Sequence, residues 1–299
     1  MKNVNNYNLW TALITPLDSE GNVQLDDLEK LLRQQEIAGN GILILGSTGE
    51  ALNLSSTEKK DILRFTISLN LNVPIMVGVG GIHIESTLNW LSFCESVKVD
   101  AYLLVTPLYA KPGIEGQVIW FETLLESVTK PCVLYNVPSR TGKKLEFEVI
   151  KRLCNHENFW AIKEASGSTD DFSKYVEIVK KSSNKNTKVF SGDDILMPEF
   201  SKLGAKGLIS VASNSWPTQT NSYCNKALNN QLNEEDITLW KTACDLLFSA
   251  SNPIPVKCLI HAEKTIETDN MKLPLISSDL LKKDLESLMK YSVQIKNWK

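Results

Sequence analysis

The chain has 299 residues, of which 42% are apolar and 22% charged, and its 32 basic and 35 acidic side chains give a net charge of −3. This composition is typical of one or two globular domains and excludes disorder, a coiled coil and a collagen-like rod. The balanced charge provides no basic surface for nucleic acid or for an anionic membrane, so we expect a small-molecule ligand.

The N-terminal segment and the cysteines indicate the cellular compartment of the protein. The first ten residues contain one lysine and four asparagines but no apolar core of a signal peptide, and no apolar run approaches the roughly 18 residues of a membrane span. The six cysteines lack a C-x-x-C pair and lie mostly in apolar surroundings, which indicates reduced core thiols. We therefore expect a cytosolic protein without a membrane segment.

Eight short runs of apolar and β-branched residues are the predicted strands. The first seven begin 28–32 residues apart, and the eighth begins 19 residues after the seventh. The runs are Trp10–Leu17, Gly41–Thr48, Val73–Gly80, Ala101–Leu108, Pro131–Pro138, Phe159–Ser166, Lys188–Asp194 and Gly207–Asn214. The segments between them have helical periodicity, as in Ile62, Phe65 and Leu69 behind a capping-box pattern from Ser55 to Glu58.

Alternating strands and helices define the fold class. Continuous apolar strands imply a parallel sheet covered by helices, and eight such units in about 215 residues favour a closed (β/α)8 TIM barrel over an open doubly wound sheet. After Asn214 the apolar spacing is helical only. We predict an α/β protein with a barrel over residues 1–218 and a helical C-terminal domain over residues 219–299.

Polar residues lie at the ends of the second and fifth predicted strands, where barrel active sites are found. The turn Gly46–Glu50 places two glycines around two hydroxyls, and its backbone N–H groups can hold a carboxylate, although an ordinary loop uses the same residues. Tyr135 supplies a phenol, and Arg140 a guanidinium that can bind a carboxylate through two hydrogen bonds.

Lys163 lies inside the sixth predicted strand. A buried lysine is costly unless its charge is paired or its pKa is lowered, and a lowered pKa makes it a nucleophile; alternatively, the side chain points outward and reaches solvent. Tyr135 and Lys163 are each the fifth residue of their runs, and neighbouring strands lie about 4.8 Å apart, so the two side chains can meet inside the barrel.

An amine beside a phenol, near a carboxylate-binding turn and an arginine, suits Schiff-base chemistry on a 2-oxo acid. Such chemistry needs no metal or cofactor, because the iminium is itself the electron sink. The three histidines (His83, His156 and His261) lack ligand or triad spacing. Asp193 and Asp194 lack a third ligand nearby, so we predict that they accept hydrogen bonds at a strand end rather than bind a metal.

Five short motifs, in their order and spacing, resemble those of the dihydrodipicolinate synthase and N-acetylneuraminate lyase superfamily. They are Gly46-Ser47-Thr48-Gly49-Glu50, Tyr135-Asn136-Val137-Pro138-Ser139-Arg140-Thr141-Gly142, Ile162-Lys163-Glu164-Ala165, Ser191-Gly192-Asp193-Asp194 and Asn252-Pro253-Ile254-Pro255-Val256-Lys257. Each motif is weak alone, but together they are specific and span essentially the whole chain. The arginine at position 140 resembles the pattern of the synthases, and the pattern of the lyases has no arginine there. The serine at position 47, in contrast, is usual in the lyases.

The resemblance implies a role for each of these residues. Lys163 would form a Schiff base with pyruvate, and Tyr135 would donate and accept protons. A relay would join Tyr135 to Ser47, where the family usually has a threonine hydroxyl, and to Tyr109 of the neighbouring subunit. Substrate binding is implied for three further residues: Thr48 and the backbone around Ile209 for the pyruvate carboxylate, and Arg140 for the carboxylate of the incoming aldehyde.

The function implied is condensation of pyruvate with aspartate 4-semialdehyde to 4-hydroxy-tetrahydrodipicolinate, which leads to diaminopimelate and lysine, in a homotetramer built from dimers. Two alternatives stay open: a pyruvate-dependent aldolase of a sugar acid, similar to N-acetylneuraminate lyase, and a barrel that binds a metabolite without turnover. Lysine-inhibited family members line a cleft between subunits with His, Asn, Glu and Tyr. This sequence has Ser56, Lys59, Ile82, Ser86 and Leu108 at those positions, so we expect weak or absent lysine inhibition, although His83 and Glu85 lie one position from a match.

Overall fold

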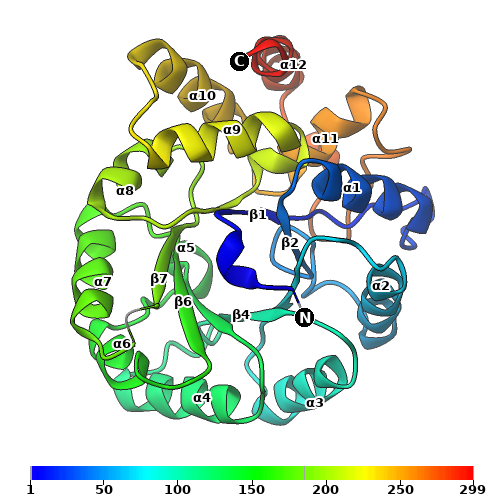
Figure 1. Ribbon diagram of the computed structural model, residues 1–299. Helices are drawn as coiled ribbons and strands as arrows, with labels where there is room; N and C mark the ends of the chain where they lie inside the picture. The colour runs from blue at the N-terminus through cyan, green and yellow to red at the C-terminus, as the bar shows by residue number, and fades with distance from the viewer. Residues whose placement is uncertain (1, 185, 299) are drawn as a thin grey trace.

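Eight parallel strands close into a barrel in sequence order, with β8 hydrogen-bonded to β1 (Figure 1). The computed structural model describes residues 2–184 and 186–298. The strands are β1 (Leu9–Ala12), β2 (Gly41–Ile44), β3 (Ile75–Val79), β4 (Ala101–Val105), β5 (Cys132–Asn136), β6 (Phe159–Glu164), β7 (Lys188–Ser191) and β8 (Leu208–Ser210). Each overlaps one of the eight predicted runs, so the predicted TIM barrel is confirmed.

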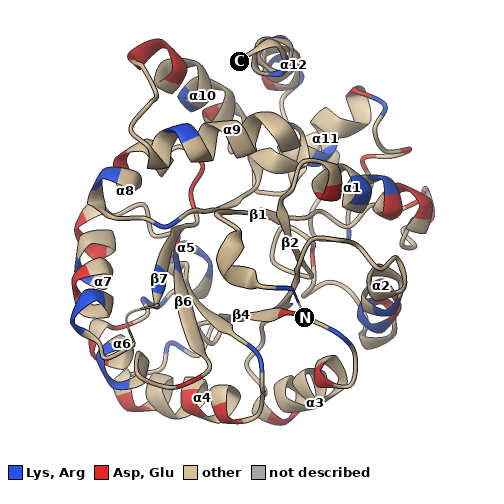
Figure 2. Ribbon diagram, in the orientation of Figure 1, with Lys and Arg blue, Asp and Glu red and all other residues tan. Residues whose placement is uncertain are grey.

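A ring of helices surrounds the strands, and further helices follow the barrel (Figure 1). They are α1 (Leu25–Ile37), α2 (Ser56–Ser68), α3 (Ile84–Glu95), α4 (Ile114–Glu126), α5 (Pro138–Thr141), α6 (Phe147–Leu153), α7 (Thr169–Lys181), α8 (Met197–Leu203), α9 (Pro217–Leu228), α10 (Glu234–Leu247), α11 (Ile254–Ala262) and α12 (Lys282–Asn297), with 3-10 turns η1 (Val4–Asn6), η2 (Ala212–Asn214) and η3 (Ser277–Asp279). Figure 2 shows acidic and basic residues interspersed over these helices. No helix within the described ranges is long and apolar enough to cross a membrane.

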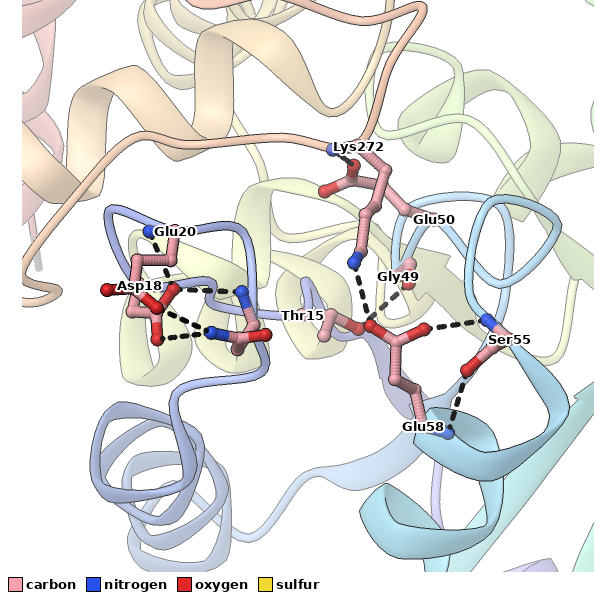
Figure 3. Close-up of polar contacts among 9 residues, drawn as sticks. Thr15, Asp18, Glu20, Gly49, Glu50, Ser55, Glu58 and Lys272 are labelled. Carbon is pink, nitrogen blue, oxygen red and sulfur yellow. Dashed lines mark hydrogen bonds and ion pairs between the residues drawn. The ribbon is translucent and has the colours of Figure 1, made fainter.

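The predicted capping box begins α2. Glu58 N–H donates to Ser55 Oγ at 3.2 Å, and Ser55 N–H donates to Glu58 Oε2 at 2.7 Å, as Figure 3 shows. These two bonds satisfy backbone donors that the first turn of a helix leaves free. The start of α2 is therefore specified by residues that lie next to each other in the sequence.

Aromatic side chains fill the N-terminal end of the barrel. Trp10 and Trp160 pack with ring centroids 5.9 Å apart, and Trp160 lies 5.5 Å from Phe190. The turn η1 lies across the centre of the ring of strands in Figure 1, and Asn5 Oδ1 accepts a hydrogen bond of 2.9 Å from Trp160 Nε1. Because this end is closed by packed side chains, the polar residues at the other end of the strands are left to form the site.

The C-terminal helices pack on one side of the barrel. A cluster of rings joins them, with Tyr223 stacked on Trp240 at 4.3 Å and Trp240 perpendicular to Trp216 at 5.9 Å. The helical extension is thus confirmed, while the boundary between residues 218 and 219 stays a prediction. All six cysteines are buried and free, as expected of core thiols.

Candidate active site

Lys163 and Tyr135 lie side by side at the C-terminal end of the barrel. They are partners in the β5–β6 register, and the Lys163 Nζ lies 4.3 Å from the centroid of the Tyr135 ring. Lys163 is only 5% exposed. The prediction that the two side chains meet is confirmed, and the alternative that Lys163 reaches outward to solvent is wrong.

The surroundings of Lys163 favour its neutral amine. Burial lowers the pKa of Lys163 to about 7; the negative charge of Asp194 opposes this shift, and the positive charge of Arg140 adds to it. At neutral pH a large share of the molecules therefore carries an uncharged amine, which is the nucleophilic form.

Tyr135 is buried as a protonated phenol. Burial raises its pKa, while the Arg140 charge and a hydrogen bond with Ser47 act in the opposite direction. The phenol can therefore give a proton to a substrate oxygen and exchange it with the Ser47 hydroxyl. The Ser47 hydroxyl thus lies close enough to Tyr135 to act on the pKa of its phenol, and the proton relay between the two hydroxyls stays a prediction.

A cavity of about 600 Å³ opens at this end of the barrel, and Ser47, Tyr109, Tyr135 and Arg140 are among the residues that line it. Arg140 comes from the short helix α5, which directly follows β5. Tyr109 lies on the loop after β4 and is 90% exposed. A side chain so exposed is not packed against Tyr135, so the predicted three-residue relay is not assembled within one chain.

Three predicted site residues are buried and do not line the cavity. They are Lys163, which reaches the cavity through its contact with Tyr135, and Thr48 and Ile209. Ile209 belongs to β8 and to the apolar cluster inside the barrel that also contains Tyr135. Thr48 lies in the turn after β2, and its Oγ1 accepts a hydrogen bond of 2.9 Å from Asn252 Nδ2.

Asn252 is a residue of the site to which sequence reasoning gave no role. Its side chain donates to Thr48, and its backbone oxygen accepts a hydrogen bond of 3.1 Å from Arg140 Nη2. It therefore contacts two of the three residues for which carboxylate binding is predicted. The only sequence signal was its place at the head of the fifth motif, which named no partner.

A second contact with the C-terminal part of the chain fixes the turn after β2. Glu50 Oε1 pairs with Lys257 Nζ at 2.7 Å, and both side chains are buried. Glu50 Oε2 accepts a hydrogen bond of 2.7 Å from the Lys272 backbone, which Figure 3 shows beside the bond between Thr15 Oγ1 and the Gly49 carbonyl. The glycine turn is therefore a fixed element rather than an ordinary mobile loop.

The two aspartates after β7 are engaged by protein donors. Asp193 Oδ1 accepts from the Ile195 N–H at 2.9 Å, and Asp194 Oδ2 accepts from the Val211 N–H at 2.9 Å. Burial raises the pKa of Asp194 to about 6, and the hydrogen bonds that it accepts from the Ser210 hydroxyl and the Val211 N–H act against that shift. Both carboxyl groups are thus hydrogen-bond acceptors at a strand end, as predicted.

A (β/α)8 barrel with a buried lysine of lowered pKa against a tyrosine phenol defines the class of proteins that can form a Schiff base with a carbonyl substrate. Residues 5–292 match the model of the dihydrodipicolinate synthetase family, and the chain belongs to this family. The resemblance stated from the sequence motifs is therefore confirmed.

Known relatives match this chain over nearly their whole length, and solved structures of similar proteins match its fold. A 4-hydroxy-tetrahydrodipicolinate synthase of Francisella philomiragia is 46% identical over 98% of this chain and 97% of its own. The crystal structure of dihydrodipicolinate synthase from Thermotoga maritima matches 97% of this chain and 98% of its own, with a TM-score of 0.90 and 29% identity. The chloride-inhibited dihydrodipicolinate synthase from Acinetobacter baumannii, complexed with pyruvate, matches 97% and 99% with a TM-score of 0.88 and 31% identity.

Proposed function

We propose that this protein condenses pyruvate with aspartate 4-semialdehyde to give 4-hydroxy-tetrahydrodipicolinate, on the route to diaminopimelate and lysine. The observation that carries the proposal is the buried Lys163 amine, with its pKa lowered to about 7, in contact with Tyr135 beside a cavity that Arg140 lines. Family membership and relatives that carry the synthase name support it.

In the first half of the reaction, the neutral Lys163 amine attacks the ketone carbon of pyruvate. One proton passes from the amine nitrogen to the resulting oxygen and Tyr135 donates a second, so that this oxygen leaves as water and a protonated iminium forms between Lys163 and pyruvate. Loss of a proton from the methyl carbon gives an enamine, with Tyr135 and Ser47 moving that proton away. We assign the pyruvate carboxylate to Thr48 and to the backbone around Ile209.

In the second half, the enamine carbon attacks the aldehyde carbon of the second substrate, which restores the iminium, while Tyr135 returns the proton to the aldehyde oxygen, which becomes the hydroxyl of the product. Arg140 binds the carboxylate of that substrate, because a guanidinium on the cavity wall can form two parallel hydrogen bonds with it. The substrate amine then displaces Lys163 from the iminium, which closes the ring and restores the free lysine. No group outside the chain is needed as an electron sink.

We further propose a homotetramer built from dimers, in which Tyr109 enters the site of the neighbouring chain. Its 90% exposure beside the cavity supports this, as do the exposed apolar side chains of Leu52, Ile82 and Ile114 on nearby elements. We place the protein in the cytoplasm, where six free cysteines would stay reduced, with small-molecule substrates and neither nucleic acid nor membrane as partner. Sedimentation velocity tests the assembly, and a fully active monomer would exclude the Tyr109 relay.

The deciding experiment measures pyruvate consumption by the purified protein with aspartate 4-semialdehyde, next to an assay that offers N-acetylneuraminate for cleavage. We expect turnover of the semialdehyde, a fall of about 100-fold or more in kcat/KM in Arg140→Ala, and no turnover in Lys163→Ala. Cleavage of N-acetylneuraminate alone would favour the sugar-acid aldolase that Ser47 suggests. Pyruvate binding without turnover of either substrate would favour the non-catalytic barrel.

A further inference from the structure

Asn252 links two parts of the site that come from opposite ends of the chain. Its side chain donates to Thr48 Oγ1 at 2.9 Å, across 204 positions of sequence, and its backbone oxygen accepts from Arg140 Nη2 at 3.1 Å. The residue is 8% exposed. Its side chain and its main chain therefore have different partners, which can be perturbed separately.

The side-chain bond determines what the Thr48 hydroxyl can do. A hydroxyl has one proton to donate and two acceptor lone pairs. Because Asn252 Nδ2 donates to the Thr48 oxygen, the Thr48 proton stays free for an acceptor other than Asn252. Within the described residues, Asn252 Oδ1 is buried and has no hydrogen-bond partner, so the Nδ2 bond alone orients the amide. A carboxylate of a substrate is an acceptor suited to that free proton.

The position of Asn252 is itself fixed. Five residues further on, Lys257 of α11 forms its buried ion pair with Glu50, two residues beyond Thr48 in the same turn. The turn and the segment before α11 are thus joined at two points. The Lys257–Glu50 pair therefore helps to keep the segment of Asn252 beside the turn of Thr48, and removing one partner of such a pair is costly.

We propose that Asn252 is a positioning residue that directs the Thr48 proton to the carboxylate of pyruvate, while its backbone carbonyl holds Arg140 for the second substrate. The proposal rests on the proposed function, since it refines how that same site binds its two carboxylates. It gives the C-terminal part of the chain a share in substrate binding.

Two variants separate the two contacts. Asn252→Ala removes the donor to Thr48 and keeps the backbone carbonyl, so the KM for pyruvate should rise about fivefold and that for the aldehyde should stay within about twofold. Asn252→Asp keeps the size but presents a carboxylate, which accepts the Thr48 proton and repels pyruvate. Its KM for pyruvate should rise on the order of fiftyfold. The neighbouring exposed Ser251→Ala is the matched control and should behave like wild type.

A second readout does not depend on the aldehyde. Borohydride reduction traps the pyruvate Schiff base on Lys163, and mass spectrometry gives the pyruvate concentration for half-maximal trapping. This concentration should rise in the order wild type, Asn252→Ala, Asn252→Asp, with melting temperatures unchanged. A protein that traps pyruvate but does not turn over the aldehyde would contradict the proposed function and still decide the role of Asn252.

Three results would overturn the proposal. One is unchanged pyruvate dependence in both variants. Another is an equal rise of both KM values, accompanied by a lower melting temperature, which is the result expected from a purely structural residue. The third is a wild-type protein that pyruvate and borohydride do not modify. The role assigned to Asn252 requires a Schiff base between pyruvate and Lys163, so it would be excluded together with that Schiff base.

Discussion

The two buried lysines of the site region, Lys163 and Lys257, differ in what stands next to the ammonium group. Lys257 lies 2.7 Å from Glu50 Oε1 and 2.6 Å from the Asn270 carbonyl. Among the described residues, Lys163 forms no ion pair within 4 Å, and its nearest neighbours include the face of the Tyr135 ring. Burial is common to both residues, so it cannot by itself mark the reactive one.

The partner decides which physical outcome burial has. Burial lowers the pKa of Lys257 as well, but the charge and the hydrogen bond of Glu50 oppose that shift, and the pair ties two elements together because separating it would leave a buried charge without compensation. An ammonium without a carboxylate partner instead loses its proton more readily, and Lys163 reaches a pKa of about 7. Lys257 thus joins α11 to the turn after β2, whereas Lys163 can act as a nucleophile toward a carbonyl carbon.

The largest effect is expected from Lys163→Ala, which removes the nucleophile. Turnover should fall at least about 10⁴-fold, and borohydride should no longer trap pyruvate on the protein. Lys188→Ala is the matched control, because Lys188 lies on the adjacent strand β7 but donates to the Asn5 carbonyl at the opposite end of the barrel. Retained trapping in Lys163→Ala would show that the reactive amine lies elsewhere.

Lys257→Met should instead lower stability. It leaves the Glu50 carboxylate buried without its cation, so the free energy of unfolding should fall by about 3–5 kcal/mol. Urea denaturation followed by circular dichroism measures this change. The double variant Lys257→Met with Glu50→Gln should recover part of the loss, because the uncompensated charge is gone. Equal stability of Lys257→Met and wild type would show that this pair does not hold the turn.

Lys163→Met should change stability in the opposite direction. The folded pKa of about 7 lies below the unfolded lysine value of about 10.4, so between these pH values the unfolded chain binds more protons and wild-type stability rises with pH. At pH 7 the variant should therefore be more stable by roughly 1–3 kcal/mol, and the difference should shrink towards pH 10. A destabilised Lys163→Met at both pH values would contradict the contrast between the two lysines.

The rate of Schiff-base formation should follow the same pKa. Below about pH 7 the Lys163 amine is protonated, so the pyruvate trapping rate should fall nearly tenfold per pH unit, and above it the rate should level off. Stopped-flow or quenched trapping between pH 5 and pH 9 measures the profile, with circular dichroism as the control for folding. A rate that still rises steeply from pH 8 to pH 9 would mean an ordinary, undepressed lysine.

The parts of the site that lie along single strands could be predicted from the sequence. Tyr135 and Lys163 occupy equal positions in neighbouring runs, and strand spacing alone then brings them together. The bonds from Asn252 to Thr48 and from Lys257 to Glu50 cross 204 and 207 positions. They depend on how the C-terminal helices pack on the barrel, which strand periodicity does not encode. The exposure of Tyr109 was likewise beyond any local pattern.

A third lysine, Lys59, gives the smallest expected effect. It lines the cavity, and its Nζ lies 5.5 Å from the centroid of the Trp90 ring. Within the described residues, Lys59 forms no ion pair within 4 Å. The ammonium group of a free lysine that enters the cavity would therefore meet a like charge. His83, one position from a match, already caps α3, with its Nδ1 accepting the Ser86 N–H at 3.2 Å.

Free lysine should therefore leave the initial rate unchanged up to about 1 mM, whereas Lys59→Glu, which supplies an acidic partner, should make the enzyme measurably more sensitive. Steady-state assays with saturating substrates at constant ionic strength decide this, and Lys60→Glu on the adjacent position is the charge-matched control. Submillimolar inhibition of the wild type would show that the lysine cation is bound by side chains other than those at the five matched positions. Glu85 and His83, which would then have to leave its capping position on α3, would be the first residues to substitute.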